Sequence, residues 1–120
     1  MSRRISFTKL ENELIRSFRE KINTAATAED IASAFSQTMG KLLAGAMGES
    51  TPDARDVITF EPKAKDFYLL DDVLASNASF TEIMHESDLP QIISRFAETA
   101  HRRRQRILEH REKTEAKIRN

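Results

Sequence analysis

The first half of the chain carries two runs of apolar residues spaced three and four positions apart. The first run is Phe7, Leu10, Leu14, Phe18 and Ile22, and the second is Ile31, Phe35, Met39, Leu42, Leu43 and Ala46. This spacing gathers each run on one face of an α-helix. The pattern predicts helices over about 7–23 and 28–47. Because the segment between them is short, we expect the two helices to form an antiparallel hairpin.

Residues that can cap helices support these starts. Thr27 is followed closely by acidic residues, an order that suits the positive end of a helix dipole. Thr8 and Glu11 have the spacing of a capping box, and so do Ser79 and Glu82. The sequence therefore predicts reciprocal side-chain caps at Thr8 and at Ser79.

The helical spacing is lost after the second run. Gly48, Pro52 and Pro62 interrupt it, and several charged residues between them keep the backbone in contact with water. We therefore predict an irregular loop over 48–65.

Two interpretations are open for the segment around the end of this loop. Residues 57–60 have β-branched character and can pair with 68–70, although four residues before a proline make a weak strand. Asp66 is an equally good helix cap. We favour a helix over about 67–76, with another short helix over about 80–86.

The final element is the longest. Pro90 stands in its first turn, where proline is tolerated, and neither glycine nor proline follows. We predict one helix over about 89–118, which would be ~45 Å long, whereas a small domain is only ~30 Å across. The dense part of its apolar stripe is Leu89, Ile92, Ile93, Phe96, Ala97 and Ala100. We therefore predict a basic helical overhang at 102–120, which leaves the fold or lies on another subunit.

Together these elements predict an all-α protein folded as a single domain over 1–120. A chain of 120 residues is long enough to bury one core without covalent staples. The lack of cysteine excludes disulfides, thiolate metal sites and thiol catalysis, and it favours the cytoplasm. No apolar run approaches the ~20 residues of a membrane span, so we expect no membrane partner.

The formal net charge is zero, but the charges are distributed unevenly along the chain. Residues 1–22 carry six basic and three acidic side chains, residues 23–101 carry five and thirteen, and residues 102–120 carry eight and three. Basic ends therefore flank an acidic middle. This pattern favours docking of the ends on the middle, within one chain or between chains.

The densest charge cluster lies at the start of the predicted overhang. It contains Arg102, Arg103, Arg104 and Arg106, with Arg111 further along the helix. Guanidinium groups bind phosphate oxygens in pairs, so one function for this cluster is contact with a nucleic-acid backbone. Interleaved glutamates and the lack of aromatic residues after Phe96 favour instead a contact with acidic groups of a protein.

Two Glu-x-x-His motifs, Glu82–His85 and Glu98–His101, suggest a third function. The spacing puts a carboxylate and an imidazole on one helical face, as in carboxylate-bridged di-iron bundles. Such a site also needs inward-facing glutamates from two further helices, and the helix over 28–47 offers acidic residues only near its start. We therefore predict no metal or other cofactor, and keep these four residues as the least favoured hypothesis.

None of the common hydrolase, phosphate-loop or zinc-protease motifs is present in the sequence. The interpretation that fits the pattern best is a non-enzymatic helical interaction module, predicted to be a homodimer, whose contacts are the arginines of the cluster. A nucleic-acid-associated accessory protein that uses the same arginines is the alternative.

Overall fold

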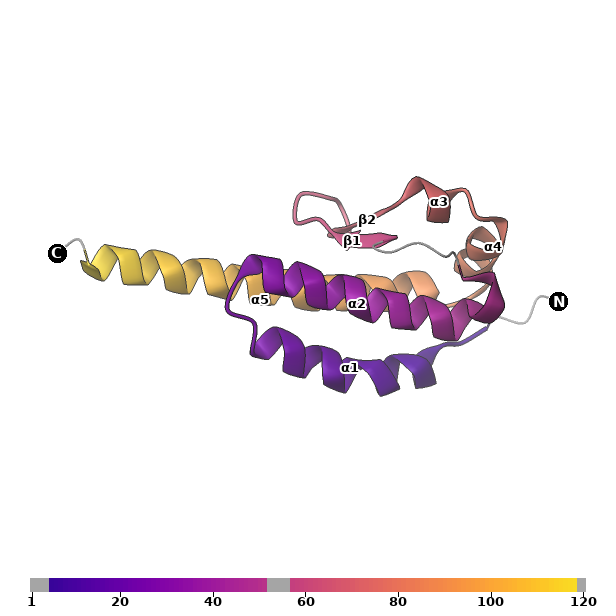
Figure 1. Ribbon diagram of the computed structural model, residues 1–120, viewed down its shortest axis with the longest axis horizontal. Coiled ribbons are helices and arrows are strands. Elements are labelled where there is room, and N and C mark those ends of the chain that lie inside the picture. The colour runs from indigo at the N-terminus through magenta and orange to yellow at the C-terminus, as the bar shows by residue number, and fades with distance from the viewer. Residues whose placement is uncertain (1–4, 52–56, 119–120) are drawn as a thin grey trace.

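The computed structural model describes residues 5–51 and 57–118, and it describes the side chains of the last helix as far as Glu109. Residues 52–56 of the predicted loop lie outside it. The elements in chain order are α1 (Thr8–Asn23), α2 (Ala28–Met47), the 3-10 helix η1 (Gly48–Ser50), β1 (Ile58–Phe60), β2 (Tyr68–Leu70), α3 (Asp72–Ala75), α4 (Ala78–Glu86) and α5 (Leu89–Ile118). The mostly helical class is confirmed, and so are the first two helices and the long last one (Figure 1).

α1 and α2 form the predicted antiparallel hairpin (Figure 1). Thr27 caps α2, because its hydroxyl accepts a hydrogen bond from the Asp30 N–H while the Asp30 carboxylate accepts one from the Thr27 N–H. The two helices approach closely at Gly45, where an added Cβ would lie 2.7 Å from a side-chain carbon of Leu10. Glycine at this position therefore lets Leu10 pack directly on α2.

α5 completes the core by packing on both hairpin helices. The side chains that it contributes with no solvent exposure are Leu89, Ile92, Ile93, Phe96, Ala97 and Ala100. The ring of Phe96 meets that of Phe18 in α1 edge-to-face, with centroids 5.0 Å apart. The dense apolar stripe predicted for the start of this helix is therefore the part that is buried in the core.

The capping box predicted at the start of α1 is wrong. α1 begins after Phe7 without a side-chain cap. The Thr8 hydroxyl donates instead to Asp88, next to the start of α5, and Glu11 forms an ion pair with Arg95. Thr8 and Glu11 therefore bind residues on a distant part of the chain instead of capping α1.

The cap predicted at Ser79 is wrong as well. α4 is capped by Asn77, whose side-chain oxygen accepts a hydrogen bond from the Phe80 N–H at 2.9 Å. Asn77 stands two positions before Ser79 and is as good a cap by residue type. The helix therefore begins earlier than the spacing of Ser79 and Glu82 indicated.

A two-stranded hairpin occupies part of the segment for which a loop was predicted. β1 and β2 pair antiparallel, in the register that sets Ile58 opposite Leu70. The irregular loop over 48–65 therefore contains a strand, and the alternative pairing of 57–60 with 68–70 is the correct one. Ile58 is buried in the core, so burial stabilises a strand that is weak by its length.

The favoured helix over 67–76 is wrong in its first half. Phe67 has a φ of 68°, the left-handed conformation, which no α-helix contains. The helical turn of α3 follows later and is capped by Asp71, whose carboxylate accepts a hydrogen bond from the N–H two residues on. Asp71 and not Asp66 is thus the cap.

The molecule is elongated, with principal extents of 64 × 27 × 23 Å. α5 causes this shape, because it continues well past the turn between α1 and α2 (Figure 1). α3 and α4 lie at the opposite end of the long axis from the C-terminal end of α5. One end of the molecule is therefore built of several packed elements and the other of a single helix.

Candidate functional site

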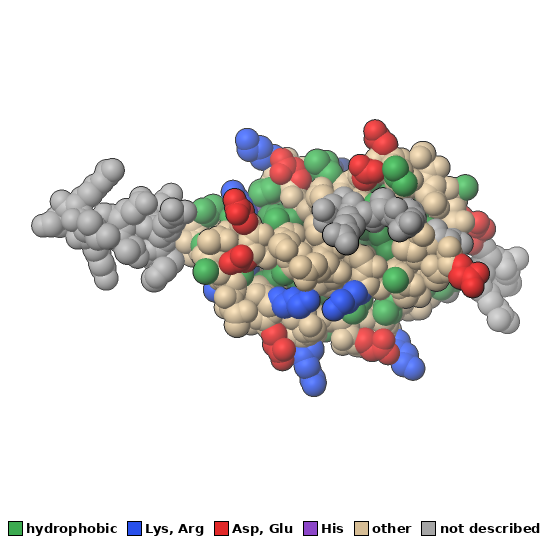
Figure 2. Space-filling view, viewed as in Figure 1, with side chains coloured by type: hydrophobic (Ala, Val, Ile, Leu, Met, Phe, Trp, Pro, Cys, Tyr) green, Lys and Arg blue, Asp and Glu red, His purple; other side chains and the backbone are tan. Residues whose placement is uncertain are grey.

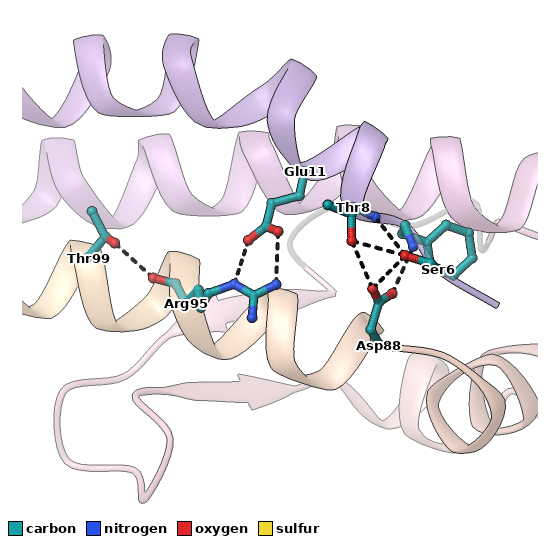
Figure 3. A network of polar contacts seen from close by, with 7 residues as sticks. Ser6, Thr8, Glu11, Asp88, Arg95 and Thr99 are labelled. Atoms are coloured by element: carbon teal, nitrogen blue, oxygen red, sulfur yellow. Dashed lines mark hydrogen bonds and ion pairs between the residues drawn. The ribbon is translucent and has the colours of Figure 1, made fainter. Parts of the chain in front are cut away.

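α5 divides into two parts with different surroundings. We call residues 89–103 the proximal half and residues 104–118 the distal half. α1 lies alongside the proximal half. Three residues join the two: Asp88, which directly precedes α5, Arg95 and Arg103. Figure 3 shows the first two contacts. These contacts decide which of the predicted partner-binding residues are engaged within the chain.

The first contact joins Asp88 to the start of α1 (Figure 3). Its carboxylate accepts hydrogen bonds from the Phe7 N–H at 2.8 Å and from the hydroxyls of Ser6 and Thr8 at 2.9 and 3.2 Å. Partial burial opposes ionisation of Asp88, but these hydrogen bonds outweigh it, and the pKa of the carboxyl is lowered below its ordinary value. The charge is also favourable beside the positive end of the α1 dipole.

The second contact is an ion pair between Glu11 of α1 and Arg95 of α5 (Figure 3). Nε and Nη2 of Arg95 donate to the two carboxylate oxygens of Glu11 at 2.7 and 2.8 Å. This bidentate geometry is the strong form of the arginine–carboxylate pair. It fixes the register of the two helices near their N-terminal ends.

Arg103 makes the third contact, at the other end of α1. Its Nε donates to the carbonyl oxygen of Ile22 at 2.9 Å, and its Nη2 donates to that of Asn23 at 3.1 Å. Carbonyl groups in the last turn of a helix lack intrahelical partners and form the negative end of the dipole, so a cation is favourable there. Arg103, predicted to bind a partner or phosphate, is therefore engaged within its own chain.

The other arginines of the cluster differ in their contacts. Arg102 forms an exposed ion pair with Glu98 one turn earlier. Among the described residues, no hydrogen bond or ion pair engages Arg104, which is half-buried, or Arg106, which is exposed. Arg111 lies beyond the last described side chain. Arg104 and Arg106 are therefore the predicted contact residues with described side chains that remain available to bind a partner.

His101 has a structural role that the sequence did not indicate. Its ring stacks on that of Phe67, with centroids 3.9 Å apart and planes 7° from parallel. Nδ1 of this histidine is buried and has no hydrogen-bond partner among the described residues. The stack docks the loop of the β1–β2 hairpin on α5.

The two Glu-x-x-His motifs are not brought together. Glu82 and His85 are exposed on α4, whereas Glu98 and His101 lie on α5, where each has the contact given above. Over residues 5–51 and 57–118, no group of three or more potential ligands is placed to hold a metal ion. Nothing in the described geometry therefore favours the metal hypothesis.

A sequence signal for the role of Arg103 was present. Leu89, Phe96 and Arg103 stand seven positions apart, and this spacing keeps side chains on one face of a helix. Since Leu89 and Phe96 are buried against the hairpin, Arg103 extends the same face to the end of α1. The spacing predicts the direction of the side chain, but the carbonyl groups that it meets are given only by the fold.

Comparisons with models of known protein families, with curated proteins and with solved structures find no match for this chain. Within the described part of the chain, no helix has the length and apolar character needed to cross a membrane. Function is therefore inferred from the surfaces that the fold leaves exposed.

Proposed function

We propose that this protein is a non-enzymatic, self-associating helical module, a homodimer in which the distal half of α5 contacts a second copy. One observation carries the proposal: α5 continues as a single helix to Ile118, past the end of the α1–α2 hairpin (Figure 1). Helices of fewer than about 12–15 residues are marginal in water without packing. A projecting helix of this kind gains stability when a partner covers it.

Charge supports a second copy as that partner. Residues 66–94 contain six carboxylates and no lysine or arginine, whereas residues 102–120 contain eight basic and three acidic side chains. α3 and α4, which belong to the acidic segment, lie at the opposite end of the long axis from the C-terminal end of α5 (Figure 1). An antiparallel arrangement of two copies sets each basic end against an acidic end, so the same contact forms twice.

The nucleic-acid alternative receives less support from the side-chain contacts. Arg103 is occupied by carbonyl groups of α1, and Arg102 by Glu98. Phe96, the last aromatic residue of the chain, has no exposed surface on which a base can stack. Fluorescence anisotropy with a labelled duplex at low salt tests this alternative, which predicts tight binding that weakens steeply as salt is added.

The proposal is tested by measuring the mass of the protein in solution. We expect multi-angle light scattering to give the mass of a dimer at high protein concentration and low salt, and a shift toward monomer between ~50 and ~500 mM salt because exposed charges are screened. A protein that stays monomeric at several hundred micromolar and low salt would contradict the proposal.

A pair of variants identifies the surface. We expect Arg104→Glu with Arg106→Glu to shift the equilibrium toward monomer, because neither arginine has a partner among the described residues of its own chain. Arg16→Glu with Arg19→Glu is the matched control, since both residues are exposed on α1 and the change in net charge is identical. Equal weakening by both pairs would mean that total charge, not the distal half, governs association.

A further inference from the structure

The segment from β2 to α3 exposes two large apolar side chains. Leu69 is 54% exposed and Val73 is 52% exposed, the highest values among the large hydrophobic residues of the described chain. Single exposed apolar residues are ordinary on protein surfaces. Leu69 lies on β2 and Val73 on α3, so two consecutive elements each expose a large apolar side chain.

Three carboxylates stand next to this apolar pair in the sequence. Asp66, Asp71 and Asp72 are all exposed. Figure 2 shows acidic side chains beside hydrophobic ones along the edge of the molecule that carries the β1–β2 hairpin and α3. Neither of the two ion pairs found among the described side chains uses a carboxylate of this segment. The surface therefore suits a partner that brings an apolar side chain flanked by cations.

The distal half of α5 presents such a combination. Arg104 and Leu108 stand four positions apart, which places them one turn apart on the same face of the helix. Leu108 is only half-buried. α3 lies at the opposite end of the molecule from the C-terminal end of α5, so the last turns of this helix meet α3 on another copy and not on their own (Figure 1).

We infer that the surface formed by Asp66, Leu69, Asp71, Asp72 and Val73, here called the β2–α3 edge, receives the distal half of α5 from a second copy. The inference rests on the proposed function and specifies the receiving surface. Leu108 packs against Leu69 and Val73, and the arginines beside it pair with the carboxylates. Because each copy has one helix end and one edge, two reciprocal contacts close the dimer.

Exchange of charges between the two surfaces tests the inference. The edge variant is Asp66→Lys with Asp72→Lys, which leaves the α3 cap Asp71 intact. The helix variant is Arg104→Glu with Arg106→Glu. We expect each variant alone to raise the dissociation constant of the dimer by about tenfold or more, because like charges then face each other. Mixed in equal amounts they should form a heterodimer close to the wild-type affinity, because both contacts are again complementary.

Controls separate this inference from the proposed function. Glu13→Lys with Glu20→Lys, two exposed residues of α1, matches the edge variant in charge and should leave the dimer unchanged. If the helix variant weakens the dimer but the edge variant does not, the β2–α3 edge is the wrong surface while self-association stands. Failure of the mixture to restore the dimer also overturns the reciprocal contact. If the wild-type protein is monomeric, the proposed function fails first and the inference with it.

The apolar part of the contact has its own readout. Leu69→Ala with Val73→Ala leaves every charge in place, and we expect it to weaken the dimer at high as well as at low salt. Circular dichroism of each variant verifies that the helices are retained. A dimer that is insensitive to the loss of both side chains would show that the apolar pair is not part of the interface.

Discussion

The proximal and distal halves of α5 share one uninterrupted helical backbone, but their described side chains have different surroundings. The proximal half buries Leu89, Phe96 and Ala100 completely, and its polar residues hold α1 at several points. The distal half extends past the hairpin, and of its side chains described as far as Glu109, only Ile107 packs against the core.

The difference shows that helix formation and burial are separate properties of this sequence. Both halves are free of glycine, the one proline, Pro90, stands in the first turn, and both halves contain pairs of opposite charge one turn apart, which support a helix without packing. Burial follows instead from the apolar stripe, which thins after Ala100. Substitutions in the two halves should therefore have different consequences for the stability of the monomer.

The largest loss of stability is expected for a substitution in the buried part of the proximal half. Phe96→Ala removes a ring with no exposed surface that contacts Phe18, and should lower the free energy of unfolding by about 3–5 kcal/mol. Leu108→Ala in the distal half should cost less than about 1 kcal/mol under conditions that keep the protein monomeric. Urea unfolding followed by circular dichroism compares the two. If Phe96→Ala does not fold, Ile93→Val should still cost about 0.5–1.5 kcal/mol.

A smaller loss of stability is expected when Arg103, at the junction of the two halves, is replaced. Arg103→Ala removes two hydrogen bonds to carbonyl groups at the end of α1, which should lower the free energy of unfolding by about 1–2 kcal/mol. Arg106→Ala removes the same type of side chain from an exposed position and should change stability by less than about 0.5 kcal/mol. Equal effects in chemical unfolding of the monomer would contradict the assignment of Arg103 to the fold.

Asp88 should make the attachment of the proximal half depend on pH. Its folded-state pKa lies below the unfolded one, so its stabilising effect is complete above the unfolded pKa and is lost as pH falls through the folded pKa, that is, below about pH 4. Asp88→Asn should lower stability by about 1 kcal/mol at neutral pH. The difference between the variant and the wild type should shrink on acidification, which thermal melts over a pH series measure. A constant difference would mean that ionisation of Asp88 is not the cause.

The smallest effect is expected for the exposed ion pair between Glu98 and Arg102. Side chains exposed by 51% and 71% are well hydrated, so Glu98→Gln should cost about 0.5 kcal/mol or less, and less still at high salt. Chemical unfolding at two salt concentrations measures this. A loss above about 1 kcal/mol would show that the exposed pair is more important for the fold than its hydration indicates.

The candidate site could be predicted only in part. The sequence located the arginine cluster and the projecting helix, because charge density and the absence of helix breakers are visible in it. The seven-residue spacing from Phe96 gives the direction of the Arg103 side chain, but not its partners, the carbonyl groups of Ile22 and Asn23, which are about 80 positions away. Likewise, nothing local marks Phe67 as the stacking partner of His101.

The sequence by itself determined the three long helices of this protein, because the spacing of Phe7 to Ile22, of Ile31 to Ala46 and of Leu89 to Ala100 is a local property that every turn of a helix repeats. Only the tertiary structure decided that Thr8 and Glu11 form no cap, why residues 57–70 make a hairpin and which arginines stay available. Local pairs such as Thr8 and Glu11 compete with distant partners, and Asp88 and Arg95 offer stronger hydrogen bonds because they carry charge.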